Sequence, residues 1–232
     1  MASAIARGGS PACSSASASR VRRPGPRTRR AAPPRRRRSK KQLRSKLQAL
    51  AAEHPEHSLQ LWCQDEARFG QKGRTTRVWY ERGVRPPGVV DQRYKSLYLF
   101  AACRAGTDES FALALPRADA GTMEVFLEHF ARQLAPGVHA VLILDQAGWH
   151  DERALHVPTS ITLLPLPSAS PQLNPVERVW LYLRERYLSH RVLDDYEAVL
   201  DAVCRAWNKL VDENGRLTTL TAYPYLIASQ IP

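Results

Sequence analysis

A run of four aliphatic residues that ends in a carboxylate, Val141–Leu144 followed by Asp145, constrains the fold of this sequence most strongly. Such a run is typical of a buried strand, because a short stretch without polar residues is usually covered on both faces. Asp145 would then lie at the edge of a sheet, where solvent, a metal ion or a substrate can reach it. Two further carboxylates are expected in comparable places: Asp65 follows the strand-like stretch 59–64, and Glu177 opens a predicted helix.

The order of the predicted elements indicates a mixed α/β domain. Period-2 alternation and short apolar runs predict strands at 59–64, 78–80, 97–103, 111–115, 138–144 and 161–164. Helical spacing of apolar residues predicts helices at 39–53, 123–134, 174–188 and 194–214. The strands 97–103 and 111–115 should form an antiparallel hairpin, whereas the later strands follow helices or long connections and should run parallel.

The charge of the chain is unevenly distributed. Residues 1–47 contain fifteen Arg and Lys and no Asp or Glu, so the 34 basic and 22 acidic residues of the whole chain leave 19 basic and 22 acidic residues for positions 48–232. We expect residues 1–38 to be a disordered Arg-rich tail, because proline and charge are frequent there and large apolar residues are few. A polyanion is its expected partner, through release of counterions from phosphates.

The rest of the chain suits one domain of ordinary size. We expect a linker helix at residues 39–56 and one α/β domain at residues 57–232, with 191–232 as a C-terminal helical extension. No apolar run approaches the ~20 residues that a membrane-spanning helix needs, so no membrane partner is expected. The four cysteines are far apart and form no CxxC pair, which indicates neither a zinc site nor a disulfide framework.

The three carboxylates Asp65, Asp145 and Glu177 predict metal chemistry if folding brings them together. Like charges a few ångströms apart cannot all remain ionised unless a cation lies between them. Carboxylate oxygens without His or Cys nearby favour Mg²⁺ or Mn²⁺ over zinc. Two such ions about 3.5 to 4 Å apart can activate a water or a 3′-hydroxyl and stabilise the leaving oxygen in phosphodiester chemistry.

Each carboxylate also has a purely structural interpretation. The pair Asp65–Glu66 could face water at the end of a strand. Glu177 falls three residues after Asn174, with Pro175 between them, so it could complete a capping box in which Asn174 is the N-cap. Asp145 has the weakest structural alternative, because the strand before it is entirely apolar.

Three segments of the sequence resemble the motifs of DDE transposases, in the bacterial insertion-sequence branch of the mariner superfamily. They are 62–70 (WCQDEARFG), 142–150 (LILDQAGWH) and 164–180 (LPLPSASPQLNPVERVW). Trp79, Arg82, Gly83 and Pro86 also resemble the connecting stretch of that branch. The resemblance covers about residues 50–215, and the third segment at this spacing from the second is highly specific. Gln146 and Ala169 depart from the family pattern, which has Asn and an aromatic residue there.

This resemblance implies an RNase H-like fold, a mixed five-stranded sheet flanked by helices. It implies that Asp65, Asp145 and Glu177 are the catalytic residues and hold two Mg²⁺ or Mn²⁺ ions. The implied reaction is nicking at transposon ends followed by attack of a 3′-hydroxyl on target DNA. The implied partner is double-stranded DNA, bound by a homo-oligomer in the bacterial cytoplasm at the nucleoid.

Neighbours of these residues are weaker predictions. Trp149 and His150 could touch DNA or pack against the domain, and Arg178 could contact a phosphate or be a solvated helix charge. Trp180 and Leu183 are expected on the core face of their helix. Glu66 receives no catalytic role from the resemblance and is expected to support the site or the fold.

The resemblance leaves end recognition unassigned. Relatives carry a DNA-binding region of helix-turn-helix type before the catalytic domain, whereas positions 1–57 have too few apolar residues for three helices. The chain is therefore predicted to be either the catalytic half of a two-frame element, with a helix-turn-helix partner encoded in an upstream frame, or a truncated remnant. The alternatives to an active transposase are an inactive remnant that binds nucleic acid nonspecifically and a host nuclease of RNase H-like fold.

Overall fold

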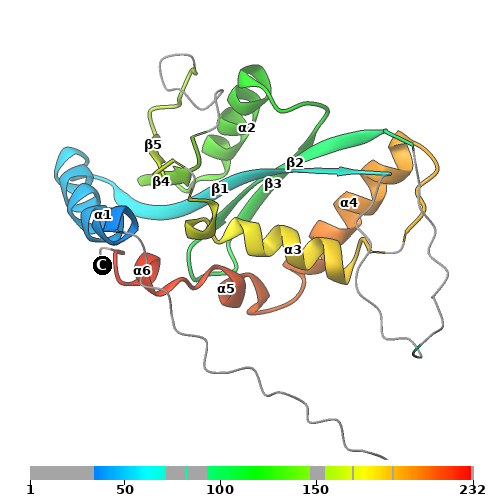
Figure 1. The fold of residues 1–232 in the computed structure, drawn as a ribbon. Coiled ribbons are helices and arrows are strands. Elements are labelled where there is room, and N and C mark those ends of the chain that lie inside the picture. The colour runs from blue at the N-terminus through cyan, green and yellow to red at the C-terminus, as the bar shows by residue number, and fades with distance from the viewer. Residues whose placement is uncertain are drawn as a thin grey trace, which may run out of the picture. The chain divides into compact units, whose positions relative to one another are not determined.

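The computed structural model describes residues 34–71, 82, 93–146, 155–168, 170–189 and 191–230, all within the compact unit Pro33–Pro232. Its centre is a five-stranded sheet (Figure 1). The strands are β1 (Ser58–Gly70), β2 (Ser96–Arg104), β3 (Ser110–Leu115), β4 (Val138–Leu144) and β5 (Ile161–Pro165). The described helices are α1 (Pro34–Glu53), α2 (Ala120–Gln133), α3 (Val176–Arg186), α4 (Tyr196–Val211), α5 (Arg216–Thr221) and α6 (Pro224–Ile227), with a 3₁₀ turn at Pro171–Leu173. Among these described helices, none is long and apolar enough to cross a membrane.

The sheet has the strand order β3-β2-β1-β4-β5. β1 pairs antiparallel with β2 and parallel with β4, β2 and β3 form the predicted hairpin, and β4 and β5 are parallel. All seven residues of β4 are buried, as its aliphatic run predicted. This order, with an antiparallel half and a parallel half that share β1, confirms the RNase H-like fold. The predicted strand 78–80 lies outside the described residues.

β1 is much longer than the predicted strand 59–64, and Asp65 lies in its interior rather than at its end. The prediction was wrong because β1 changes partners along its length. Its parallel pairing with β4 stops at Cys63, whereas its antiparallel pairing with β2 continues to Gly70. Asp65 therefore marks the end of the parallel ladder and not the end of the strand.

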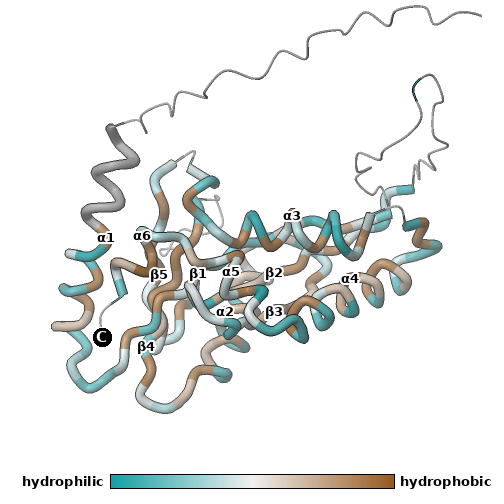
Figure 2. Tube along the Cα trace, turned by 90° about the horizontal axis from the view of Figure 1, so that it is seen from below, coloured by the Kyte–Doolittle hydropathy of each residue, from teal (hydrophilic) through white to brown (hydrophobic). Residues whose placement is uncertain are grey.

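The two faces of the sheet are covered by different helices. Side chains alternate along a strand, so Leu61 and Cys63 of β1 pack in the cluster that contains α3 and α4 residues, whereas Trp62 packs against α2. Figure 1 shows α2 on one side of the sheet and α3 and α4 on the other. In Figure 2 the α4 tube alternates between brown and teal, as expected of a helix with one apolar face. Position 65 shares the α3 face with positions 61 and 63.

The helix ends follow local sequence chemistry. Asp119 caps α2 in a capping box with Thr122, and Asp195 caps α4 by accepting a hydrogen bond from the N–H of Ala198 at 2.8 Å. Both long helices are thereby confirmed close to their predicted ranges. Gly215 lies beyond the end of α4, as the N-cap of α5, and has φ of +74°, a value that glycine adopts without strain.

α1 was predicted over 39–53 as part of a linker. The helix ends at Glu53, before Pro55, as predicted, and begins earlier, at Pro34, where a proline is tolerated in a first turn. Leu43 and Leu47 are buried in the same cluster as the β1 and α3 side chains, so this helix packs on the domain. Residues 1–33 of the predicted basic tail lie outside the described residues.

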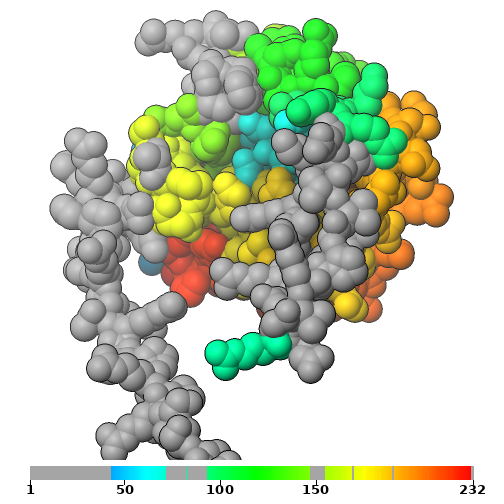
Figure 3. Space-filling view, turned by 45° about the vertical axis from the view of Figure 1, so that its right-hand side comes forward, coloured from blue at the N-terminus to red at the C-terminus, as the bar shows by residue number. Residues whose placement is uncertain are grey.

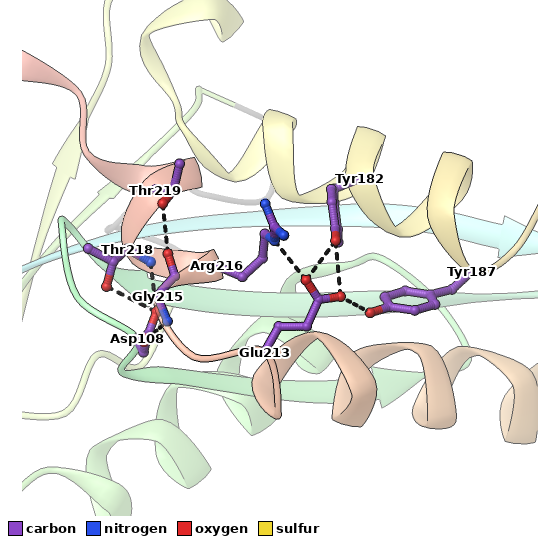
Figure 4. Close-up of polar contacts among 8 residues, drawn as sticks. All are labelled: Asp108, Tyr182, Tyr187, Glu213, Gly215, Arg216, Thr218 and Thr219. Carbon is purple, nitrogen blue, oxygen red and sulfur yellow. Dashed lines mark hydrogen bonds and ion pairs between the residues drawn. The ribbon is translucent and has the colours of Figure 1, made fainter.

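Three helices, α4, α5 and α6, lie within the range 191–232 that was predicted as a C-terminal helical extension. Figure 4 shows how the turn after α4 is held: the carboxylate of Glu213 accepts hydrogen bonds from Arg216 and from the hydroxyls of Tyr182 and Tyr187. Asp108, in the turn between β2 and β3, accepts from the N–H groups of Gly215 and Thr218. The extension is thereby fixed to α3 and to the hairpin.

Candidate active site

The pairing of β1 with β4 brings Asp65 and Asp145 to neighbouring positions. The parallel ladder runs from Ser58↔Val138 to Cys63↔Ile143, a constant offset of 80 positions (143 − 63). The ladder stops there, and the same offset continued for two residues would place position 65 beside position 145. Asp145 directly follows β4 and is exposed, whereas Asp65 retains only 8% of its accessible surface. The sheet thus supplies one buried and one solvent-facing carboxylate.

Glu177 lies exposed in the first turn of α3. Asn174 sets the start of that helix, because its side-chain oxygen accepts a hydrogen bond from the N–H of Val176 at 3.2 Å. The amide of Asn174 donates to the backbone carbonyl of Gln64 at 2.7 Å, in a buried contact. The Asn174 side chain therefore both bonds to the first residue of α3 and ties this helix to the strand residue that precedes Asp65.

The capping-box interpretation of Glu177 finds no support in these contacts. A capping box would require the Glu177 carboxylate to accept from the N–H of Asn174, but that N–H donates to the carbonyl of Pro171 at 2.8 Å. Pro175 has helical dihedral angles, φ −69° and ψ −19°, as expected of proline at a first helical position. The helix start is thus stable without Glu177, whose carboxylate is free of a capping role.

The other carboxylates act electrostatically on Asp65. Burial is the largest cause that raises the pKa of Asp65, to about 8, and the negative charges of Glu177, Glu66 and Asp145 raise it further. A hydrogen bond from Trp180 opposes this shift in part. Near neutral pH the ionised form of Asp65 is therefore costly, and a cation between the carboxylates would remove the cost.

The donor set fits Mg²⁺ or Mn²⁺ chemically, because it consists of carboxylate oxygens on β1, directly after β4 and on α3. In the described part of the chain, no three His, Cys, Asp or Glu side chains are already gathered as a ligand cluster. Asp145 and Glu177 are exposed, so their side chains can turn toward a cation beside the buried Asp65. In Figure 3 the cyan β1 residues reach the surface between green residues on the α2 side and the yellow residues around α3.

Glu66 belongs to the other face of the sheet. It alternates with Asp65 along β1, and its carboxylate accepts a long hydrogen bond, 3.4 Å, from the side-chain amide of Gln64. The charge of Glu66 still acts on Asp65, but its side chain lies with those that face α2. This geometry agrees with a supporting role.

The remaining predicted residues divide into two groups. Trp149, His150 and Trp79 lie outside the described residues. Arg178 is exposed, and its guanidinium lies 5.7 Å from the ring centre of Tyr223, in the segment between α5 and α6. An exposed cation therefore stands directly beside Glu177.

Two contributors to the site were missed from the sequence. Trp180 is buried as predicted, but its indole N–H also donates to the Asp65 carboxylate at 2.8 Å. Tyr225, near the C-terminus, donates its hydroxyl to the carbonyl of Leu173, just before the cap of α3. A tryptophan three residues after Glu177, on the same helix face, was the available signal for the first; the second had none, because 52 residues separate its partners.

The fold defines the class: an RNase H-like domain that carries Asp65 on β1, Asp145 directly after β4 and Glu177 on α3. The family model of the DDE superfamily endonucleases matches residues 60–200, more than half of the chain. The chain therefore belongs to the DDE endonuclease superfamily. The match ends at residue 200, within α4, so α5 and α6 lie beyond it.

The chain is also similar to one relative and to solved structures. An uncharacterized protein y4pE/y4sA of Sinorhizobium fredii is 44% identical over 123 residues, which are 53% of this chain and 91% of that protein. The mariner Mos1 paired-end complex with Mg has 16% identity and a TM-score of 0.53, over 84% of this chain and 63% of that one, which shows a shared fold. A Mos1 transposase paired-end complex with the left transposon end has 17% identity and a TM-score of 0.47, over 90% and 67%. The chain spans about two thirds of these transposase chains.

Proposed function

We propose that this chain is the catalytic domain of a transposase that nicks DNA at transposon ends and joins the freed 3′-hydroxyl to target DNA. Asp65, Asp145 and Glu177 are its catalytic residues and hold two Mg²⁺ or Mn²⁺ ions. The observation that supports this most directly is the raised pKa of Asp65, produced first by burial and then by Glu177 and other carboxylates that reach it from separate elements.

The chain's own residues have distinct tasks in this reaction. Asp65, buried and bonded to Trp180, is the fixed ligand, whereas Asp145 and Glu177 are exposed and face the side from which DNA approaches. The bound ions would activate a water or 3′-hydroxyl and stabilise the leaving oxygen. Arg178 stands beside Glu177 as an exposed cation, which suits contact with a DNA phosphate.

Double-stranded DNA is the proposed partner, and two DNA-binding contributions are separable. The fifteen basic residues of positions 1–47 would bind phosphates without regard to sequence. Recognition of the transposon ends is assigned to a helix-turn-helix partner encoded in an upstream frame, and assembly on DNA to a homo-oligomer. The proposed location is the bacterial cytoplasm, at the nucleoid. The fold shared with the mariner Mos1 paired-end complex supports DNA as the partner.

The test is a nicking and strand-transfer assay on DNA that carries the element's ends, with Mg²⁺ or Mn²⁺ against EDTA. Asp145→Asn should abolish both products, because it removes a proposed ligand without changing the side-chain shape. Asp201→Asn is the matched control, since Asp201 is an exposed aspartate on α4 that pairs with Arg205. Metal-dependent cleavage that survives Asp145→Asn would refute the assignment.

Two other functions predict different results in the same assay. A catalytically inactive remnant would bind nucleic acid with a steep salt dependence, lose binding on deletion of residues 1–47, and show no cleavage. A host nuclease would cleave in a manner that depends on Asp145 but shows no preference for transposon ends. The transposase assignment requires both metal-dependent cleavage and transfer of the 3′-end.

A further inference from the structure

The contact between Trp180 and Asp65 joins two of the elements that form the site. Trp180 lies on α3, three residues after Glu177 and therefore on the same helix face. Its Nε1–H donates to Asp65 Oδ2 at 2.8 Å, and the two residues retain only 1% and 8% of their accessible surface. A buried hydrogen bond thus connects the helix that carries Glu177 with the strand that carries Asp65.

The indole has little freedom to turn. The Phe69 ring meets it at an interplanar angle of 73° with ring centres 6.0 Å apart, and the Trp207 ring of α4 lies on it at 6.3 Å. α3 is also anchored just before its first residue, through the Asn174 amide, which donates to the Gln64 carbonyl. The N–H of Trp180 therefore points in a direction set by the packing of three elements rather than by Asp65.

The Trp180 N–H makes the two carboxylate oxygens of Asp65 different, because it bonds to only one of them. An indole nitrogen only donates, and it donates one hydrogen, so it occupies one side of the carboxylate. With Oδ2 bound to Trp180, Oδ1 is the oxygen that can face a cation beside Asp145 and Glu177. A hydrogen bond to an ionised acceptor is also stronger than a neutral one, which favours the charged form that a cation requires.

We propose that Trp180 is a positioning residue of the reaction centre: its N–H holds Asp65 so that Oδ1 faces the divalent cation, and it fixes Asp65 relative to the helix that carries Glu177. This inference rests on the proposed function, because it assumes that Asp65 is a metal ligand. Trp180 acts through Asp65 and touches neither DNA nor the reacting phosphate. Partners that orient metal ligands typically affect metal affinity 10- to 100-fold when they are lost.

The test measures Mn²⁺ binding by isothermal titration with the full chain in the absence of DNA. Trp180→Phe removes the N–H and keeps an aromatic ring between Phe69 and Trp207, and we expect it to weaken Mn²⁺ binding about tenfold. Trp207→Phe removes an indole from the same cluster and should leave Mn²⁺ affinity within about twofold of the wild-type value. Asp65→Asn sets the level of binding that remains without the ligand.

A second variant separates the hydrogen bond from the packing. Trp180→benzothienylalanine replaces the indole N–H by sulfur at nearly unchanged shape, so it keeps the core filled even if the smaller phenylalanine destabilises the domain. The same tenfold loss of Mn²⁺ affinity is expected, with a parallel fall in nicking that additional Mn²⁺ restores.

The outcomes distinguish the two proposals. The role of Trp180 would be overturned if the benzothienylalanine variant binds Mn²⁺ with wild-type affinity while Asp65→Asn abolishes binding. The proposed function would then still stand. Mn²⁺ binding that is the same in wild type and Asp65→Asn would instead overturn the metal-ligand role of Asp65, and the role of Trp180 with it.

Discussion

Two carboxylates of this molecule, Asp65 and Glu213, have opposite electrostatic surroundings. Burial and neighbouring negative charges raise the pKa of Asp65 to about 8. Hydrogen bonds from Tyr187, Arg216 and Tyr182 lower the pKa of Glu213 to about 2 (Figure 4). Glu213 has the partners that an ionised carboxylate needs, whereas the partners of Asp65 are mostly other carboxylates. A carboxylate that accepts hydrogen bonds from nearby donors stabilises the fold. A buried carboxylate close to other carboxylates indicates a place for a cation.

The largest expected effect comes from Asp65→Asn. Loss of a proposed ligand should reduce nicking by at least about a thousandfold, because residues of one catalytic unit do not compensate for each other. In EDTA at pH 7 the same change should stabilise the fold by roughly 2 to 4 kcal/mol, since it removes a buried group that resists ionisation. Nicking assays and urea unfolding measure the two effects. Unchanged or lower stability would show that Asp65 carries no electrostatic strain.

Glu213→Gln should have the opposite pattern of effects: it should lower stability and leave nicking nearly unchanged. The glutamine cannot serve as the charged acceptor for Arg216 and two tyrosine hydroxyls, so the melting temperature should fall by several degrees. Nicking at a temperature well below the transition should remain within about twofold of wild type, because Glu213 lies in the turn after α4 and outside the carboxylate site. Strong loss of nicking in a folded Glu213→Gln protein would contradict this separation.

The pH dependence of these two variants should run in opposite directions in metal-free buffer. The penalty from Asp65 is absent below its ordinary pKa of 3.8 and grows as pH rises toward about 8, so the advantage of Asp65→Asn should grow over that range. The stabilisation from Glu213 is complete above its ordinary pKa of 4.5 and is lost as pH falls toward about 2. Unfolding free energies of each variant minus wild type, measured at several pH values, test both slopes.

The smallest effect on stability is expected at Asp201, an exposed carboxylate in a surface ion pair. Asp201 pairs with Arg205 one helical turn later, and both side chains are more than half exposed. Such a pair contributes little in water, so Arg205→Ala should change stability by no more than about 0.5 kcal/mol, less at high salt. Chemical unfolding in low and high salt measures it. A larger loss of stability in Arg205→Ala would mean that the exposure of Asp201 does not make its contribution smaller than that of Glu213.

The sequence predicted the strands and long helices well because their signals are local. The apolar run of β4, the stripe of α2 and the cap at Asn174 each depend on neighbouring residues, and the structure confirms all three. The same local patterns could place Asp145 and Glu177 on the correct elements. Their convergence with Asp65 was expected only from the resemblance to a family.

The errors arose where distant segments decide the outcome. The true length of β1 depends on its pairing with β2, some thirty to forty residues later in the chain, which no pattern within 59–64 reveals. Helical periodicity showed that Trp180 is buried but could not show where its N–H points. The hydroxyl of Tyr225 supports the start of α3 from beyond the family match. Long-range hydrogen bonds of this kind leave no periodic signal.

The constant offset between β1 and β4 has a consequence for how such sequences can vary in length. The separation of Asp65 from Asp145 in space depends on the ladder and not on the 79 residues between them, so insertions in the turns of that interval leave the pair intact. A single residue inserted between Ser58 and Asp65 would instead turn the carboxylate toward α2 or shift it along β4. Homologous chains should therefore differ in length in their connections, while the seven-residue stretch that leads to the first carboxylate stays fixed.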